Sequence, residues 1–190
     1  MKIVNIAKGS ELSASQMLSN RTDSDFDDVD RTVKEVIEDV RKRGDEAVFY
    51  YMHKFGGPTK EQMGQLRVTE KEIQEAYDAC EPDVISAFEK AADNIRRFHK
   101  HQLNETWSYR EGNGIMLGQI IRPIKNVGVY IPGGSAPLFS SVFMNIIPAT
   151  IAGCPRIVMC TPAGKDGKIN KYILAAAKIA GAHEIYKAGG

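Results

Sequence analysis

The sequence predicts an α/β protein in which a mainly helical amino-terminal region, residues 1–104, is followed by a hairpin and a βαβαβ parallel sheet in residues 105–190. Through the first hundred residues, apolar side chains recur at helical spacing. From residue 127 onward, short apolar runs alternate with helical segments, which is typical of parallel strands joined by right-handed crossovers. A glycine-containing turn at 132–135 joins the first of these strands to its helix.

The helices of the front region are predicted from their apolar stripes and end signals. The first runs over 27–43 and ends at Gly44, a residue favoured after helix C-termini, and the second follows over 45–55. Thr69 caps the third helix, and Pro82 opens the long fourth one. Apolar stripes support the first and fourth helices: Val29, Val33, Val36 and Val40 in one, and Val84, Phe88, Ala91, Ile95 and Phe98 in the other.

The back region begins with a hairpin that is expected around residues 112–114. The sheet follows, with strands at 127–131, 156–160 and 184–188 and helices at 137–152 and 170–180. The first two strands are almost wholly apolar, so we expect both of their faces to be buried. Ligands of open parallel sheets bind beyond the carboxyl ends of the strands. Because the chain stops at such a loop, at Gly189 and Gly190, we expect it to be a truncated part of a longer protein; the alternative is a flexible natural terminus.

The composition limits which partners and which cellular compartment are expected for this protein. The net charge of +1 gives no general attraction to nucleic acid or to anionic membranes. Three cysteines form no disulfide framework, which fits a reducing compartment. The amino terminus has neither a long apolar run nor a cleavage-site pattern, so we expect no signal peptide, and no run is apolar enough to cross a membrane. We therefore expect a cytoplasmic protein with neither nucleic acid nor membrane as a partner.

The glycine turn is the first candidate site. Gly133 and Gly134 permit close backbone approach by a ligand, Ser135 is a suitable helix cap, and Pro137 suits the first helical turn. Free amides at such a helix start favour an anion. The pattern is not the G-x-G-x-x-G dinucleotide fingerprint, and no acidic residue follows where a ribose would need one. A purely structural turn therefore remains an equal alternative.

Other chemistry-bearing residues give weaker signals. Tyr130 ends the first strand beside the turn, where it could stack on a ligand or could be an ordinary strand tyrosine. His99 and His101 are two apart and do not share a helix face, so we predict no metal site in this chain. Cys154 and Cys160 have no base or cation nearby in sequence and are interpreted as structural thiols. No acid–base pair, and hence no catalytic residue, is nominated.

Several longer stretches carry a resemblance to a known family. They are VRKRGDEAVFYYMHKFGG (40–57), AADNIRRFHKHQ (91–102), VGVYIPGGSAPLFSSVFMNIIPATIAGC (127–154), IVMCTPAGKDGKIN (157–170) and AAAKIAGAHEIYKAGG (175–190). In this order and spacing, with Trp107 ahead of the hairpin, they resemble the amino-terminal half of histidinol dehydrogenase. The resemblance covers nearly the whole chain from about residue 30.

The resemblance implies an oxidoreductase of histidine biosynthesis. The family oxidises L-histidinol to L-histidine through an aldehyde, in two hydride transfers to NAD, with a catalytic zinc and as an intertwined homodimer. Its fold is an incomplete Rossmann-like sheet with helical extensions. The tyrosine that matches Tyr130 contacts NAD, which makes Gly133 and Gly134 expected neighbours of the cofactor. The family does not require the cysteines matching Cys154 and Cys160 as zinc ligands.

The same resemblance implies what this chain lacks. The family's catalytic Glu-His pair and zinc ligands would fall after Gly190, so we predict that the 190-residue chain alone is inactive. Hydride removal from an alcohol needs a base near the hydroxyl proton, and a metal lowers that proton's pKa. Two alternatives stay open: a related zinc- and NAD-dependent dehydrogenase of another small alcohol, and a non-catalytic nucleotide-binding or dimerisation module.

Overall fold

A computed structural model describes residues 26–133 and 137–189, and the chain divides into two compact units, residues 1–47 and 48–190. Most of the described part of the first unit is helix α2 (Phe26–Arg43), which confirms the first predicted helix. Gly44 follows it with φ +62°, the left-handed conformation that glycine adopts without strain. Along the valine stripe, Val36 and Val40 are partly buried, while Val29 and Val33 are exposed.

The remaining front helices are mostly as predicted. They are α3 (Asp45–Lys54), α4 (Lys60–Met63), α5 (Glu70–Asp78) and α6 (Pro82–Lys100). Thr69 caps α5 in a reciprocal box with Glu72, and Pro82 is in the first turn of α6. The short helix α4 was not predicted, because one turn is too short for a periodic stripe. None of the described helices is long and apolar enough to cross a membrane.

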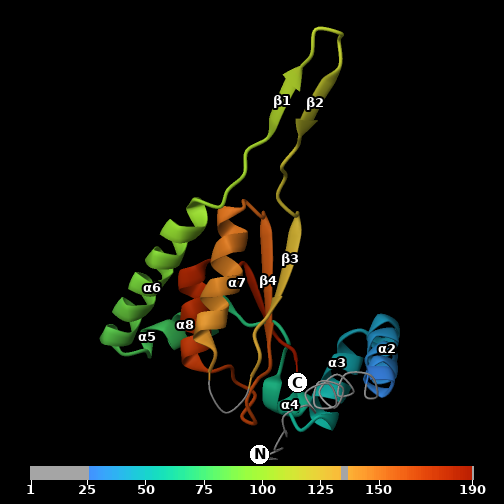
Figure 1. Cartoon of the computed structure of the whole chain (residues 1–190). Helices are drawn as coiled ribbons and strands as arrows, with labels where there is room; N and C mark the ends of the chain where they lie inside the picture. Colours follow the sequence, from blue (N-terminus) through green and yellow to red (C-terminus); the bar gives the residue numbers. More distant parts are fainter. Residues whose placement is uncertain (1–25, 134–136, 190) are drawn as a thin grey trace, which may run out of the picture. The chain divides into compact units, whose positions relative to one another are not determined.

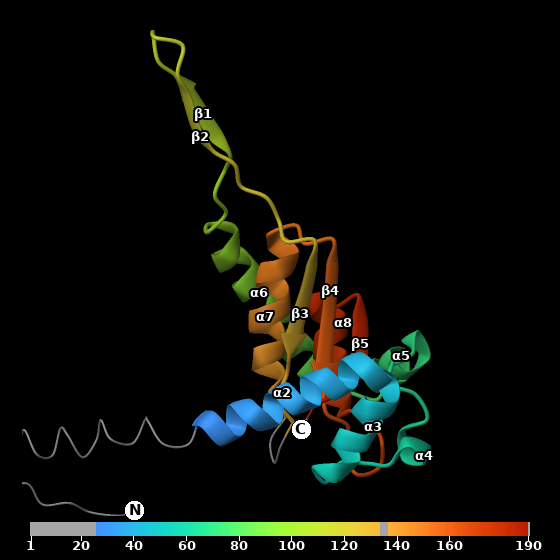
Figure 2. The same cartoon turned by 90° about the vertical axis from the view of Figure 1, so that its right-hand side faces the viewer.

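The back region has the predicted βαβαβ order. Its elements are β3 (Asn126–Tyr130), α7 (Phe139–Ile151), β4 (Arg156–Thr161), α8 (Lys171–Ala180) and β5 (Glu184–Lys187). The three strands are parallel, with β4 in the middle. The hairpin is also confirmed, with β1 (Trp107–Arg110) paired to β2 (Met116–Gln119). Figures 1 and 2 show it beyond the amino end of β3.

The helices α7 and α8 cover the same face of the sheet (Figure 1). Right-handed crossovers that advance in one direction place both helices on one side. Helix α6 packs against α7 and α8, and α5 packs against α8, so this side holds the core. The largest fully buried side chains include Phe143, Ile157 and Met159. The two-layer arrangement leaves the other face of the sheet without a helix from this group.

The prediction that the first strand is buried on both faces is wrong. Along β3 the residues alternate between exposed and partly buried, and Tyr130 is 50% exposed. The reason is topological, because β3 is an edge strand covered by helices on one face only. The central strand β4 is more deeply buried, with Ile157, Met159 and Thr161 on the helix-covered face.

Two finer predictions also need correction. Helix α7 begins at Phe139 with Leu138 as its cap residue, so Pro137 precedes the helix instead of lying in its first turn. The proposed cap Ser135 lies outside the described residues. In α6, Phe98 was predicted to lie on the buried stripe but is 61% exposed, whereas Ala92 is fully buried.

On the open face of the sheet, a charged cluster of Arg156, Glu184 and Tyr186 links strands β4 and β5. Arg156 on β4 donates two hydrogen bonds to the carboxylate of Glu184 on β5, at 2.5 and 3.0 Å, and the Tyr186 hydroxyl donates a third at 2.8 Å. These bonds, first the one from Arg156 and then the one from Tyr186, lower the pKa of Glu184 from 4.5 to about 2. They stabilise the ionised carboxylate and thereby the pairing of β4 with β5.

We expect this cluster to give the protein a defined acid sensitivity. A carboxyl whose pKa is lower in the folded state stabilises the fold above its unfolded pKa, and that contribution is lost as the pH falls from about 4.5 toward 2. In Glu184→Gln, the free energy of unfolding should depend less on pH across this window. Urea unfolding followed by circular dichroism at pH 7, 4.5 and 3 measures this. Parallel pH curves for the variant and the original chain would contradict the expectation.

Candidate functional site

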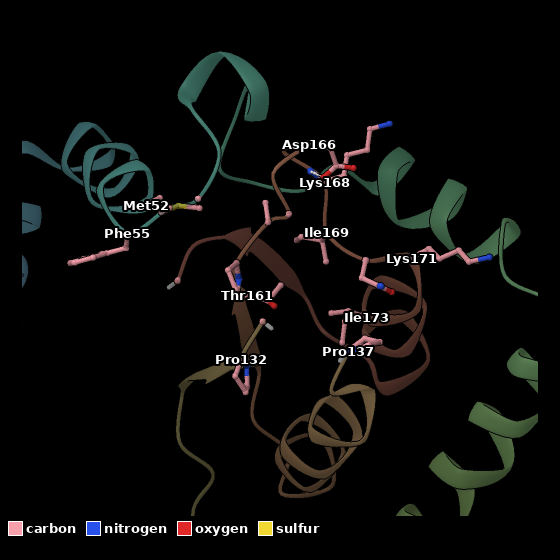
Figure 3. Close-up of a pocket in the computed structure, with 18 residues that line it drawn as sticks. Met52, Phe55, Pro132, Pro137, Thr161, Asp166, Lys168, Ile169, Lys171 and Ile173 are labelled. Atoms are coloured by element: carbon pink, nitrogen blue, oxygen red, sulfur yellow. Dashed lines mark hydrogen bonds between the residues drawn. The ribbon is translucent and has the colours of Figure 1, made fainter. Parts of the chain in front are cut away.

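A cavity of about 820 Å³ lies at the carboxyl ends of the three parallel strands, the edge where ligands of open α/β sheets bind (Figure 3). Its volume is typical of small-molecule sites. Its walls come from the turn after β3, the loop between β4 and α8 with the first turn of α8, and the segment after β5. Met52 of α3 and the residues 55–57 that follow this helix complete the lining. The lining residues used below are Pro132, Gly133, Pro162, Asp166, Lys168, Lys171 and Gly189.

At the turn after β3, Gly133 comes very close to Pro162 at the end of β4. A Cβ atom built on Gly133 would lie 2.3 Å from Cγ of Pro162, so only a bare backbone fits here. The neighbour that requires a glycine at position 133 is thus a proline of the same chain, and the close approach of a ligand stays a prediction. The two residues form one wall of the cavity, and Pro132 adjoins them.

The loop 162–170 forms a second wall, and hydrogen bonds hold its shape. The Gly164 amide donates to the Lys168 carbonyl at 2.8 Å, and the Lys168 amide donates to the Asp166 carboxylate at 3.1 Å. Gly167 is buried with φ +75°, and a Cβ there would lie 2.2 Å from the backbone oxygen of Gln62 in α4. The loop thus packs against α4, and the Asp166 carboxylate stabilises the turn by accepting the hydrogen bond from the Lys168 amide.

The start of helix α8 borders the cavity, and the positive end of its dipole favours a negatively charged group there. Its ten residues start at the cavity, and the side chain of the cap residue Asn170 accepts a hydrogen bond from the Tyr172 amide. Lys171 is turned toward Glu81 and Ala79, with bonds of 3.0 and 2.8 Å, and its hydrogen bond with Glu81 raises its pKa. Lys168 is exposed and makes no ion pair among the described residues. A helix start and an unpaired lysine favour a negatively charged group.

The structure brings two of the three predicted cofactor residues to this edge. Gly133 lines the cavity. Tyr130 does not line it, but its ring contacts Gly189, which does. Gly134 lies outside the described residues. Cofactor binding by Tyr130, Gly133 and Gly134 remains a prediction.

The described histidine, cysteine and acidic side chains do not gather into a metal site. In residues 26–133 and 137–189, no group of three or more histidine, cysteine or acidic side chains is arranged to hold a metal ion. His99 instead shares a hydrogen bond with the Gln102 side chain at 2.6 Å. Cys80, Cys154 and Cys160 are free thiols, and burial raises the pKa of Cys80 and of Cys160. The described donors therefore do not fit a zinc site.

Sequence reasoning missed the contributions of the loop 162–170 and of Gly189. One signal could have found them, because in a parallel sheet the loops after successive strands meet at the same edge. Pro162 follows β4 in the same way that Pro132 follows β3, and Gly189 follows β5. The contact of Gly167 with Gln62 had no local signal, since it depends on how the loop packs on α4.

Fold and cavity together define an α/β protein with a cavity at the carboxyl edge of a Rossmann-like parallel sheet. The sequence model of the family described as histidinol dehydrogenase matches residues 19–190. The chain therefore belongs to the histidinol dehydrogenase family.

Individual relatives agree with this assignment. The chain is 52% identical over 158 residues to a histidinol dehydrogenase of Heliobacterium mobile, and this match covers 83% of the chain and 37% of the relative. It is 42% identical over all 190 residues to one from Bacillus licheniformis, covering 43% of that protein. A crystal structure of histidinol dehydrogenase from Elizabethkingia anophelis superposes with a TM-score of 0.78 at 35% identity, over 100% of this chain and 39% of the other. The chain thus spans about two fifths of the length of these relatives.

Proposed function

We propose that this chain supplies the NAD-binding part of an L-histidinol dehydrogenase, which oxidises L-histidinol to L-histidine through an aldehyde in two hydride transfers. Family membership supports the reaction class. The cavity at the carboxyl edge of the sheet is the observation that carries the cofactor role. Bound NAD⁺ supplies the hydride acceptor, and the residues of this chain bind and orient it.

The residues around the cavity suit a dinucleotide in three ways. The start of α8 and Lys168 offer a binding place for a phosphate group. The tight wall of Gly133 and Pro162 brings bare backbone to the cavity surface. Tyr130 presents a half-exposed ring beside the cavity, where it can stack on a base or donate a hydrogen bond.

The base and the zinc of the proposed reaction belong outside the described residues of this chain. The described donors do not fit a zinc site. Asp166, an acidic residue of the cavity lining, accepts a hydrogen bond within its own turn. We therefore propose that the 190-residue chain binds NAD without turning over L-histidinol by itself, and that the active form is a homodimer of the longer family chain.

Cofactor binding is tested by titrating the 190-residue chain with NAD⁺ in a calorimeter. Tyr130→Ala should weaken binding about tenfold, the loss expected for one aromatic contact with a polar end. Tyr109→Ala is a matched control, because Tyr109 is exposed to almost the same degree, 49% against 50%, but lies on the hairpin. Equal effects of the two substitutions would contradict the proposed role of Tyr130.

The reaction is tested with a chimera in which this chain replaces the matching segment of the Bacillus licheniformis relative. NADH formation from L-histidinol with Zn²⁺ is expected from the chimera and not from the 190-residue chain. Turnover by the short chain would place a base and a metal site in this chain. Activity of the chimera only on another small alcohol would favour the related dehydrogenase, and NAD binding without any turnover would favour a nucleotide-binding module.

A further inference from the structure

The Tyr130 ring lies against the chain segment that follows β5, on the other edge of the sheet. Its ring is half exposed, and no hydrogen bond reaches its hydroxyl among the described residues. A Cβ atom built on Gly189 would lie 2.5 Å from Cε2 of the ring and 3.0 Å from the hydroxyl oxygen. The ring of a residue on β3 thus meets the chain that follows β5, although β4 lies between these strands.

Gly189 has the conformation that such a contact requires. Its φ of +138° is in the region that residues with side chains rarely adopt. The preceding Ala188 amide donates to the Tyr186 carbonyl at 3.0 Å, a tight turn that ends the strand. Gly189 also lines the cavity, so a single residue borders the cavity on one side and the tyrosine ring on another.

We propose that Gly189 is the positioning residue for Tyr130: its bare backbone sets where the phenol ring lies at the rim of the cavity. A side chain at 189 would push the ring away, because 2.5 Å is well inside van der Waals contact. The cofactor role of this contact rests on the proposed function. The position of the ring is a separate, measurable property of the chain without ligand.

A double-mutant cycle tests the coupling. Gly189→Ala should weaken NAD⁺ binding about tenfold, as Tyr130→Ala does, because both remove the ring from its place. In the Tyr130→Ala background, adding Gly189→Ala should change the Kd by no more than about twofold, since contacting residues are not additive. Gly153→Ala serves as the control, because Gly153 also has a positive φ, +78°, but no atom lies within 4 Å of its built Cβ; its Kd should be unchanged.

The ring itself is followed by NMR with labelled tyrosine, and its signals are assigned through Tyr130→Phe. Gly189→Ala should shift the Tyr130 signals without ligand and leave those of Tyr109 in place. Circular dichroism checks that each variant is folded. Unshifted Tyr130 signals, or an undiminished effect of Gly189→Ala in the Tyr130→Ala background, would overturn the positioning role. If the original chain binds no NAD⁺, the proposed function fails, and the NMR spectra still decide whether Gly189 positions the ring.

Discussion

Gly167→Ala is expected to lower the free energy of unfolding by about 3 kcal/mol, a large share of the stability of a domain this size. Two costs combine. Gly167 has φ +75°, where a side chain is strained, and its Cβ would lie 2.2 Å from the Gln62 carbonyl oxygen. Because the atom in the way is backbone, no rotamer change can relieve the clash. Either the loop 162–170 or the segment around α4 must move.

Gly153→Ala separates these two costs. Gly153 has φ +78°, nearly the same as Gly167, but nothing lies within 4 Å of its built Cβ. It should lose only about 1 kcal/mol, the strain of a left-handed backbone. Urea unfolding of both variants followed by circular dichroism gives the comparison. Equal losses would mean that the seating of the loop on α4 adds nothing to stability. A larger loss in Gly167→Ala should be accompanied by weaker NAD⁺ binding, because the loop forms a cavity wall.

The features that were predictable from sequence depend on residues close together in the chain. Thr69 and Glu72 are three residues apart, so the capping box that starts α5 is visible in the sequence itself. The hairpin signal around Gly114 is local in the same way, and that glycine indeed has a positive φ, +86°. The alternation of strands and helices followed from periodicity and correctly gave three parallel strands.

The features that were not predictable depend on strand order and on distant contacts. Tyr130 was expected on a buried strand, but the order of the strands makes β3 an edge with one covered face. The contacts of Tyr130 with Gly189 and of Gly133 with Pro162 join segments that only the folded sheet brings together. For the candidate site, the edge of the sheet and the turn after β3 could therefore be predicted from sequence. The contributions of the loop 162–170 and of Gly189 became visible only in the structure.

Lys187 is the clearest example of a residue whose environment could not be predicted from the sequence. A lysine is usually exposed, but the position of Lys187 on β5 directs its side chain into the interior. It lies on β5 in the same register as Thr161, facing the helices, and its side chain is 5% exposed. Its amino group donates to the Glu72 carboxylate on α5 at 2.7 Å, and its amide donates to the Leu66 carbonyl. Burial raises the pKa of Glu72, but the bonds from Lys187 and Thr69 outweigh this, and the pKa lies below 4.5.

Glu72→Gln is expected to destabilise the fold by about 2 kcal/mol at pH 7, since Lys187 keeps its buried charge and loses a charged partner. The estimate is below the range for a fully buried pair because the Glu72 side chain is 34% exposed. Glutamine can still close the capping box with Thr69, so the loss reports the ion pair and not the helix start. The ionised carboxylate stabilises the fold above pH 4.5 and loses this effect as the pH falls through its lowered pKa. The difference between the two proteins should therefore shrink in acid.

Adding Lys187→Met to Glu72→Gln should recover most of the lost stability, because an apolar side chain of similar length suits the buried position and leaves no unpaired charge. Lys171→Met is the matched control, since Lys171 also binds an acidic partner, Glu81, but its side chain is 35% exposed and should matter much less. Urea unfolding at pH 7 is measured for the three variants and the original chain. If Lys187→Met in the Glu72→Gln background deepens the loss, the lysine stabilises β5 through contacts other than its charge, and the ion pair is not what holds α5 to the sheet.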